Sequence, residues 1–344
     1  MRTHLSLASV SLYLFALLAF TTSPSAQKKT PPKPTEEANA DDVIRVNTAL
    51  VTLPVSVMDR SGRFIPDLKQ EQFHLYEDGV EQQIAYFDSA EKPFTVALLL
   101  DISDSTRASL RNIQDAAAAF IDQLRPADRV FIVAFDKRIS VLCEPTSDRA
   151  VLNKAIARSE TGGGTSLYEA LDLVVKQRFN SIRGRKAIVL LTDGVDTTSM
   201  SATFESSLNT VKELDALIYP IQYNTSEDLL KVQANTIEAG GHFGGGGVVT
   251  AKGERLEVAY ERATRYLKQL ADNTGGRFFS AGSLSHVRER FAGVAAELRE
   301  QYSLGYYPVN RSAERAKREL KVRVTVPNVA VRARRSYIYS VPTP

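Results

Sequence analysis

Cysteine is almost absent from this chain of 344 residues, which contains one, Cys143. A single thiol excludes internal disulfide bonds and a zinc site built from cysteines. The four histidines, His4, His74, His242 and His286, are scattered and show no metal-ligand spacing. Cys143 lies in the apolar stretch "ISVLC", which predicts a buried and unreactive thiol. Any chemistry must therefore rest on other side chains.

An excess of charge of one sign is also missing. The chain has 43 lysines and arginines against 40 aspartates and glutamates, for a formal net charge of +3. This balance creates no broad field for nucleic acid or for a membrane surface, so we expect no nucleic-acid partner. The composition, 43% hydrophobic and 24% charged, is typical of a globular protein, and the length leaves room for two domains.

Only one long apolar run occurs, and it lies at the amino terminus. Residues 5–20 carry no charge, follow Arg2, and precede small residues up to Ala26. This pattern is typical of a secretory signal peptide, and the run is shorter than the ~20 apolar residues that span a bilayer. We therefore expect a signal peptide at 1–26, no stable membrane span after its cleavage, and a protein that is secreted, periplasmic or held at the cell envelope.

Two segments with different sequence patterns follow the expected cleavage point. Residues 27–42 are polar and rich in proline, which predicts a disordered linker. Residues 43–90 alternate apolar and polar side chains, which indicates strands. Asp78 and Gly79 tolerate the positive φ angles of a tight turn, so a hairpin is expected around them. These features predict a small amino-terminal β-domain.

The carboxyl-terminal segment, residues 301–344, is again typical of strands. We expect it to pair with residues 43–90 in one antiparallel β-sandwich, although two separate small sheets would fit the sequence equally well. Arg332, Arg334 and Arg335 form a small basic cluster near its end. Such a cluster favours an exposed strand edge that discourages aggregation.

Between these flanks, residues 92–300 alternate apolar strands with helical patterns. Repeated β–α units build a mostly parallel sheet with helices on both faces, and ligands bind beyond the carboxyl ends of its strands. The sequence therefore predicts an α/β fold for this segment. The expected strands lie at 94–100, 129–135, 186–191, 217–223 and 277–280.

Polar oxygen is concentrated where the first of these strands ends. In "FTVALLLDISDSTRASL" (94–110) the apolar run stops at Asp101, and Ser103, Asp104 and Ser105 follow. A phosphate site is the weakest explanation, because neither glycine cluster, "TGGGTS" or "HFGGGG", is followed by a lysine as in a P-loop. The second cluster is typical of a flexible insertion loop.

A phosphotransferase or hydrolase is the sharper rival. Haloacid-dehalogenase-type enzymes place D-x-D after a buried strand, with the first aspartate as nucleophile and the second as general acid. Asp101 would be the nucleophile, and Thr192 would suit the second motif of that family. The second acidic position, however, is Ser103, whose hydroxyl is no proton donor at neutral pH. Asp104 comes one position too late.

A metal site fits the same stretch better. Mg²⁺ prefers oxygen ligands, typically one or two carboxylates together with retained waters. Asp101, Ser103 and Ser105 can converge on one ion, and Asp193 ends another buried strand in "LTDG". Thr165 follows three glycines, which allow the backbone to approach closely.

The residues after Thr165 predict how the next helix begins. Ser166 and Glu169 have the spacing of a capping box, an arrangement that would leave the Thr165 hydroxyl free for other contacts. Asp196, close behind Asp193, adds negative charge, and we expect an exposed loop residue or a helix cap there. Taken singly, hydroxyls and aspartates at loop–helix junctions often only cap helices. Five of them on three segments favour the metal.

Asp101, Ser103, Ser105, Thr165 and Asp193 together resemble the metal-ion-dependent adhesion site of the von Willebrand factor type A domain, D-x-S-x-S followed by a distant threonine and a distant aspartate. The resemblance covers roughly residues 92 to 300. The flanks resemble the von Willebrand-type proteins of acidobacteria, through "VSVMDRSGR", "FHLYEDG", "ADNTGGRFF" and "EQYSLGYYP".

The resemblance implies a Rossmann-like fold, a bound Mg²⁺ for which Mn²⁺ or Ca²⁺ can substitute, and a protein ligand that supplies an acidic side chain to the ion. It departs from the family at Asp104, where glycine is common, and an extra carboxylate there could strengthen metal binding or repel an acidic ligand. The sequence thus predicts an exported, non-enzymatic, cation-dependent adhesion-type module. The alternatives are a phosphotransferase or hydrolase using Asp101, and a structural envelope protein with a vestigial site.

Overall fold

The structure is a computed structural model that describes residues 50–89, 92–223, 250, 253–282, 286–310 and 316–339. Several sequence-based expectations therefore fall on residues that it does not describe. They are the signal peptide at 1–26, the linker at 27–42, the first residues of the amino-terminal β-domain, and the loop expected at "HFGGGG".

A six-stranded sheet organises the segment that follows Phe94. Its strand order is β10-β9-β8-β5-β6-β7, and every neighbouring pair is parallel except β6 and β7. The predicted mostly parallel α/β fold is confirmed. The strands are β5 (Phe94–Asp101), β6 (Arg129–Phe135), β7 (Ile139–Thr146), β8 (Arg185–Thr192), β9 (Leu217–Tyr223) and β10 (Phe279–Ala281).

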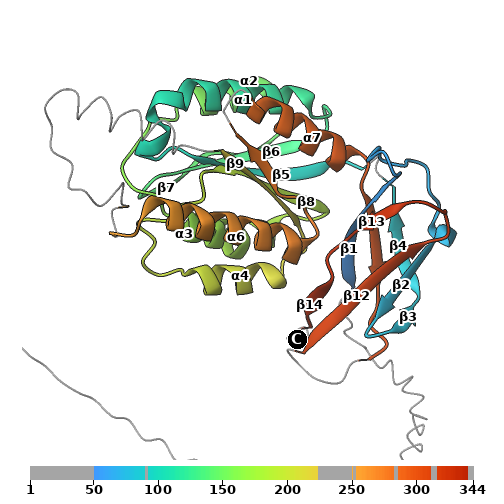
Figure 1. Cartoon of the computed structure of the whole chain (residues 1–344). Helices are drawn as coiled ribbons and strands as arrows, with labels where there is room; N and C mark the ends of the chain where they lie inside the picture. The colour runs from blue at the N-terminus through green and yellow to red at the C-terminus, as the bar shows by residue number, and fades with distance from the viewer. Residues whose placement is uncertain are drawn as a thin grey trace, which may run out of the picture. The chain divides into compact units, whose positions relative to one another are not determined.

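Helices cover both faces of this sheet, as Figure 1 shows. One face packs against α1 (Leu110–Gln123), α2 (Arg149–Ala157) and α7 (Val287–Arg299), and the other against α3 (Leu167–Leu173), α4 (Phe204–Lys212) and α6 (Leu256–Thr274). Every residue of β5 is buried, because a central parallel strand has a helix layer on each side. This double burial explains why β5 is continuously apolar from Val96 to Leu100, directly before Asp101.

The edge strand β7 is absent from the sequence-based strand assignment. It runs antiparallel to β6, and its residues are half-buried except Ser140 and Glu144, which are exposed. Such an edge strand lacks the continuous apolar run that revealed the central strands. Cys143, predicted to be buried, is only partly buried on β7, because one side of an edge strand faces solvent. Burial still raises the pKa of its thiol, as does Glu144, so the thiolate is disfavoured.

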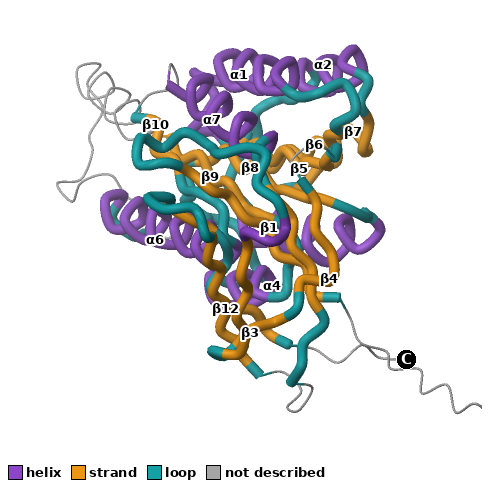
Figure 2. Tube along the Cα trace, turned by 90° about the vertical axis from the view of Figure 1, so that its right-hand side faces the viewer, coloured by secondary structure: helices purple, strands orange, loops and turns teal. Residues whose placement is uncertain are grey.

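The two flanks of the chain contribute to the same antiparallel sheets. One sheet has the order β13-β1-β11-β4 and the other β14-β12-β2-β3, so each contains strands from both ends of the chain. Figure 2 shows these strands in orange. The elements are β1 (Val51–Met58), β2 (Phe73–Glu77), β3 (Val80–Gln82), β4 (Ile84–Asp88), β11 (Tyr302–Tyr306), β12 (Lys317–Val324), β13 (Ala330–Arg332) and β14 (Ser336–Ile338).

A common apolar core joins these two sheets. Leu53 and Val55 of β1, Leu75 of β2 and Leu304 of β11 are all fully buried in it. The turn between β2 and β3 follows the expectation for a tight hairpin, because the two residues at its tip, Asp78 and Gly79, have φ angles of 48° and 83°.

The arginine cluster near the carboxyl terminus was predicted to be exposed, and this prediction is wrong for two of its members. Arg334 is only 6% exposed and donates hydrogen bonds to the backbone oxygens of Leu214 and Thr52. Arg332 binds the buried carboxylate of Glu297 on α7. A guanidinium can be buried when oxygen acceptors meet its donors, and here the acceptors come from the α/β segment, at Leu214 and Glu297, and from Thr52 of β1.

The parallel arrangement brings the ends of several strands to one edge. Asp101 ends β5, Asp136 follows β6, Asp193 follows β8 and Tyr223 ends β9. All four residues are at most 3% exposed. This carboxyl edge is therefore where the structure gathers buried polar side chains. Within the described ranges, no helix has both the length and the apolar character needed to cross a membrane.

Candidate metal centre

A network of hydrogen bonds begins at Asp101, the last residue of β5. Its Oδ1 accepts from the backbone N–H of Ser103 at 3.0 Å and from the Ser103 hydroxyl at 2.6 Å. Its Oδ2 accepts from the Thr192 hydroxyl at 2.6 Å. Short polar side chains readily form such local loops after a strand, and a 3₁₀ turn at Asp104–Ser109 then leads into α1.

The network continues to the end of β8. The Ser103 and Ser105 Oγ atoms lie 3.1 Å apart, and the Ser105 hydroxyl donates to Asp193 Oδ2 at 3.0 Å. The other Asp193 oxygen accepts from the backbone N–H of Val195 at 3.0 Å. Four of the five predicted ligands are therefore linked oxygen to oxygen across two strand ends.

The spacing of these oxygens suits a small hard cation. Neighbouring ligands of an octahedral Mg²⁺ with bonds of about 2.1 Å are about 3 Å apart. The contact between Ser103 Oγ and Ser105 Oγ and the contact between Ser105 Oγ and Asp193 Oδ2 both have this length. Ser103 and Ser105 each give their hydroxyl hydrogen to a carboxylate, so lone pairs remain on both oxygens. The donor set fits a divalent metal ion.

Burial makes the electrostatics of this network unfavourable without a cation. Asp101 is fully buried and Asp193 is 3% exposed. Burial, followed by the charge of Asp193, raises the pKa of the Asp101 carboxyl to about 7, and the hydrogen bonds from Ser103 and Thr192 oppose the rise. The donors to Asp101 are neutral hydroxyl and amide groups. A divalent cation would supply the positive charge that these partners do not.

Thr165 is held at this edge by its backbone. Its N–H donates to the Thr197 hydroxyl at 2.8 Å, and its carbonyl oxygen accepts from the N–H groups of Thr197 and Thr198. Gly162, three residues earlier, forms a β-bridge with Ser103 and donates to the Ile102 carbonyl. The Thr165 loop therefore lies beside the Asp101–Ser105 loop, but its hydroxyl is not part of the hydrogen-bond network described above.

The close approach of this loop depends on a missing side chain. A Cβ on Gly162 would lie 1.7 Å from Asp136 Oδ2, a distance far inside van der Waals contact. The Asp136 carbonyl also accepts from the Ser166 N–H at 2.8 Å, so the end of β6 and the loop are joined on both sides of Thr165. Glycine at 162 is what allows the Thr165 loop to approach β5 and β6.

Gly162→Ala should therefore move the Thr165 loop. We expect a loss of about 1–3 kcal/mol in the free energy of unfolding, typical of overpacking, together with weaker metal binding. Gly163→Ala is the matched control, because its Cβ would meet only Asp104 Oδ2, at 3.3 Å. Urea denaturation and calorimetry on both variants measure the two effects. If the two alanine variants had the same free energy of unfolding and the same Mg²⁺ affinity, the proposed role of Gly162 would be contradicted.

The predicted capping box at the start of α3 is wrong. The Ser166 side chain makes no capping hydrogen bond and instead pairs with the Thr198 hydroxyl at 2.8 Å. Glu169 accepts from the backbone N–H groups of Met200 and Ser201. Asp196 takes the capping role, since its Oδ2 accepts from the Tyr168 N–H near the helix start. The loop after β8 thus caps α3, a long-range solution that local spacing could not reveal.

Asp104, the departure from the family pattern, lies on the surface. Its carboxylate forms an ion pair with Arg107, and the two side chains are 55% and 70% exposed. An exposed pair of this kind contributes little to stability. No hydrogen bond from the Asp101–Asp193 network to Asp104 occurs among the described residues. The positive charge of Arg107 therefore partly neutralises the negative charge of Asp104.

Three polar residues at this edge were not predicted as parts of the site. Thr192 bridges Asp101 and the Gly194 N–H, Asp136 borders the Thr165 loop, and Thr197 anchors Thr165. Thr192 had been considered only for the rival enzyme. The signal for it was its place directly before Asp193, at the end of a buried strand.

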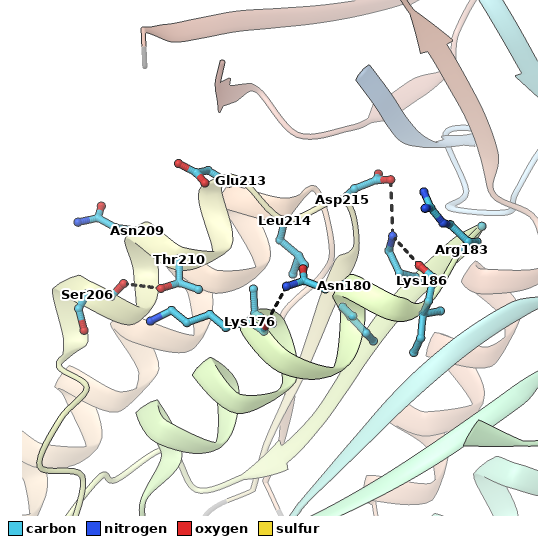
Figure 3. Close-up of a pocket in the computed structure, with 14 residues that line it drawn as sticks. Lys176, Asn180, Arg183, Lys186, Ser206, Asn209, Thr210, Glu213, Leu214 and Asp215 are labelled. Atoms are coloured by element: carbon cyan, nitrogen blue, oxygen red, sulfur yellow. Dashed lines mark hydrogen bonds and ion pairs between the residues drawn. The ribbon is translucent and has the colours of Figure 1, made fainter. Parts of the chain in front are cut away.

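A pocket elsewhere in the described structure has a different lining, which includes lysine side chains. The pocket in Figure 3, about 870 Å³, lies between the α3 region and α4 and includes Lys176, Lys186 and Asp215. Lys176 pairs with Asp172, and Lys186 lies 3.9 Å from Asp215. Its lining includes Lys186, near the start of β8, and Asp215, two residues before β9, so it opens at the amino ends of these strands, away from Asp101. It is not part of the candidate metal centre.

The donor set also differs from that of a soft-metal site. Over the ranges that the structure describes, no three histidine, cysteine, aspartate or glutamate side chains gather as metal ligands. The centre instead combines two carboxylates with hydroxyl oxygens. Oxygen donors of these two kinds are the ones that hard cations prefer, and the carboxyl edge of such a mostly parallel sheet is where ligands bind in α/β folds.

Comparison with known proteins gives a match within the α/β segment. Residues 96–195 match the family model of the von Willebrand factor type A domain. Proteins with such domains are generally binding modules rather than enzymes, and the domain commonly carries a metal-ion-dependent adhesion site and mediates protein interactions. The match includes Asp101, Thr165 and Asp193.

Curated relatives extend the similarity without naming a function. An uncharacterized Synechocystis protein, sll0103, is 36% identical over 106 residues, which are 30% of this chain and 25% of that protein. A UPF0353 protein of Mycolicibacterium vanbaalenii is 27% identical over 232 residues, 63% of this chain and 62% of that protein. The chain thus spans a quarter of the first relative and less than two thirds of the second.

Solved structures with similar folds include von Willebrand factor type A from Catenulispora acidiphila, with a TM-score of 0.46 and 11% identity over 86% of this chain and 75% of that one. Proximal thread matrix protein 1 from the mussel byssus gives a TM-score of 0.43 and 15% identity over 64% of this chain and 49% of that one. The metal-ion-dependent adhesion site of that mussel structure is occupied by zinc.

Proposed function

We propose that this protein is an exported, divalent-cation-dependent protein-binding module of the adhesion type. The observation that carries the proposal is the continuous chain of oxygens from Asp101 through Ser103 and Ser105 to Asp193, buried at the carboxyl edge of the sheet. Its oxygen spacing near 3 Å suits an octahedral hard cation. Thr165, placed beside this chain by its backbone, is the fifth proposed ligand.

The proposed ion is Mg²⁺, for which Mn²⁺ or Ca²⁺ can substitute. Ser103, Ser105 and Thr165 would hold it through hydroxyl oxygens, and Asp101 and Asp193 through their carboxylates, directly or through water. Neutral hydroxyls cancel little of the ion's charge, so a bound ion supplies a Lewis-acidic position for an incoming carboxylate. We therefore propose a protein partner that presents an aspartate or glutamate to this edge.

The remaining elements of the proposal concern location and catalysis. The apolar sequence at residues 5–20 supports export to the periplasm, envelope or medium, and the protein is proposed to lack enzymatic activity. The rival enzyme would need Asp101 as a nucleophile, yet both of its carboxylate oxygens accept hydrogen bonds from Ser103 or Thr192 and the residue is fully buried. Phosphate-ester turnover that disappears in Asp101→Asn would overturn the proposal.

Calorimetric titration with Mg²⁺ tests the metal site directly. The chain from residue 27 onward, freed of metal with EDTA and dialysed, should bind one Mg²⁺ per molecule and gain thermal stability in its presence. Binding to the native state alone raises the free energy of unfolding by about 2.7 kcal/mol when the ion is at one hundred times its dissociation constant. The absence of both heat and stabilisation in the wild type would refute the site.

Thr165→Ala should weaken Mg²⁺ binding about 10-fold or more while the protein stays folded. The substitution removes the hydroxyl, whereas the hydrogen bonds that place this loop come from the Thr165 backbone and remain. Thr165→Ser is the matched control, because it keeps the hydroxyl and should bind nearly as the wild type does. The midpoint of thermal unfolding with and without Mg²⁺ gives the readout. Alanine and serine variants with equal Mg²⁺ stabilisation would remove Thr165 from the ligand set.

The partner interaction should depend on the same ion. A pull-down from cells of the source organism, with the protein as bait, should yield a partner that EDTA releases and Mg²⁺ restores. The reason is that the proposed contact runs through a carboxylate on the metal. A partner retained in EDTA would place the binding surface on another face.

A further inference from the structure

A tyrosine at the carboxyl edge has no place in the network described so far. Tyr223, the last residue of β9, is fully buried. Its hydroxyl is one of the few buried side-chain polar atoms without a hydrogen-bond partner among the described residues. A buried, unsatisfied hydroxyl costs about 1–3 kcal/mol, so it indicates that a partner is missing.

The register of the sheet places Tyr223 beside Asp193. Thr192, the last residue of β8, pairs with Gln222 of β9, so the residues that follow this pair are Asp193, directly after β8, and Tyr223, the last residue of β9. The Gln222 side chain donates to the Asp193 carbonyl at 3.0 Å, which holds the two strand ends together.

Both side chains also belong to the same face of the sheet. Tyr219, Ile221 and Tyr223 of β9 pack in the core beneath α1 and α7, as do Val189 and Leu191 of β8. Alternation along β8 assigns position 193 to this face as well. Burial, then the charges of Asp101 and Asp193, raise the pKa of the Tyr223 hydroxyl well above its ordinary value, which agrees with a position close to both carboxylates.

We propose that the Tyr223 hydroxyl is a positioning group of the metal centre, which donates a hydrogen bond to a water molecule held between it and the edge formed by Asp101 and Asp193. The inference rests on the proposed metal site. Mg²⁺ keeps several waters in protein sites, and a fixed donor that orients one of them lowers the cost of ordering the coordination sphere. The phenol stem is buried among apolar residues, which fixes the direction of the hydroxyl.

Tyr223→Phe separates this role from a purely structural one. The variant keeps the aromatic ring and removes only an oxygen that no described residue satisfies. In EDTA its midpoint of thermal unfolding should be equal to or higher than that of the wild type, because a buried unsatisfied group has been deleted. Its Mg²⁺ affinity by calorimetry should fall about 10-fold, the size typical of outer-shell partners of metal sites.

Tyr219→Phe is the matched control on the same strand and face. The Tyr219 hydroxyl donates to Glu297 at 3.3 Å and is also fully buried. Its removal should lower the midpoint of unfolding in EDTA and leave Mg²⁺ affinity unchanged. The two tyrosines should thus show opposite patterns in stability and metal binding.

The outcomes distinguish this inference from the proposed function on which it rests. A wild-type protein that binds no Mg²⁺ overturns the metal site and this inference together. A wild type that binds Mg²⁺ while Tyr223→Phe binds it equally well overturns the role of Tyr223 alone. A lower midpoint of unfolding for Tyr223→Phe in EDTA would also overturn it, because the hydroxyl would then be satisfied within the protein itself.

Discussion

Asp101→Asn should abolish Mg²⁺ binding and, in EDTA at pH 8, make the protein more stable by about 2 kcal/mol. The metal effect is expected because asparagine removes one of two buried negative charges from the oxygen cluster. The stability effect follows from the same burial, since an ionised carboxylate next to Asp193, with only neutral donors described around it, pays a large desolvation penalty. The Asp101 carboxylate is thus expected to lower the stability of the metal-free protein while it contributes to Mg²⁺ binding.

The hydrogen bonds around position 101 allow this exchange with little loss. The asparagine oxygen can keep the two donors from Ser103, and its amide can donate to the Thr192 oxygen, because a hydroxyl both donates and accepts. Asp128→Asn is the matched control. That buried carboxylate accepts one backbone N–H on each oxygen, from Phe94 and Arg125, far from the metal edge.

Asparagine at position 128 must lose one of these two acceptors. Asp128→Asn should therefore cost about 1 kcal/mol of stability and leave Mg²⁺ binding intact. Urea denaturation in EDTA and Mg²⁺ calorimetry on both variants provide the comparison. If Asp101→Asn lost stability as Asp128→Asn does, the buried charge at 101 would have to be compensated within the protein, and the argument for a missing cation would fail.

The pH dependence of the Asp101 effect has a definite sign. The pKa of this carboxyl is raised from 3.8 to about 7, so between these values the folded state binds more protons than the unfolded state. In EDTA, the stability contributed by this group is highest below about pH 4 and falls as the pH rises toward about 7. The difference between Asp101→Asn and the wild type should therefore be larger at pH 8 than at pH 5. Parallel stability curves for the two proteins would contradict this.

Much of the α/β fold could be predicted because burial on both faces leaves a strong pattern. The central strand β5 is apolar from Val96 to Leu100, and polar side chains begin at its last residue, Asp101. The same pattern could not reveal β7, whose half-exposed side chains reflect an edge position. Nor does periodicity specify partners, so the pairing of β1 with β11, which joins Val51 to Tyr306, is visible only in the structure.

The candidate site shows the same division between local and long-range information. Asp101, Ser103 and Ser105 lie within five residues, and hydrogen bonds link their side chains in the structure. The residues that were missed or misassigned act across the fold. Asp196 caps α3 from the loop after β8, and Tyr223 ends an apolar strand where it looks like an ordinary core residue. No spacing rule connects such residues to the site before the sheet register is known.

Arg332→Ala should strongly destabilise the fold, with an expected loss of about 3–5 kcal/mol in the free energy of unfolding. Glu297 on α7 is fully buried, and both of its carboxylate oxygens accept from Arg332, at 2.8 and 2.9 Å. The hydroxyls of Ser56 and Tyr219 lie farther from it, at 3.3 Å, and are neutral. Alanine at 332 would leave a buried carboxylate without its cation.

Two further variants separate the cost of an unpaired charge from the loss of packing. Arg332→Met with Glu297→Met removes both charges at similar volume and should recover most of the stability, since a buried ion pair contributes little more than apolar groups that replace it. Arg255→Ala breaks the exposed pair with Glu257, whose side chains are 69% and 77% exposed, and should change stability by less than about 1 kcal/mol.

Arg332→Ala and the double variant also test how the strands from the two chain ends are joined to the α/β segment. Arg332 comes from β13 and Ser56 from β1, while Glu297 and Tyr219 belong to α7 and β9, so the buried carboxylate is shared by elements of both parts. Because it lies on α7 and not at the carboxyl edge, Arg332→Ala should weaken folding while leaving Mg²⁺ affinity unchanged in the folded fraction. A double variant as unstable as Arg332→Ala would show that shape, and not the unpaired charge of Glu297, determines the cost.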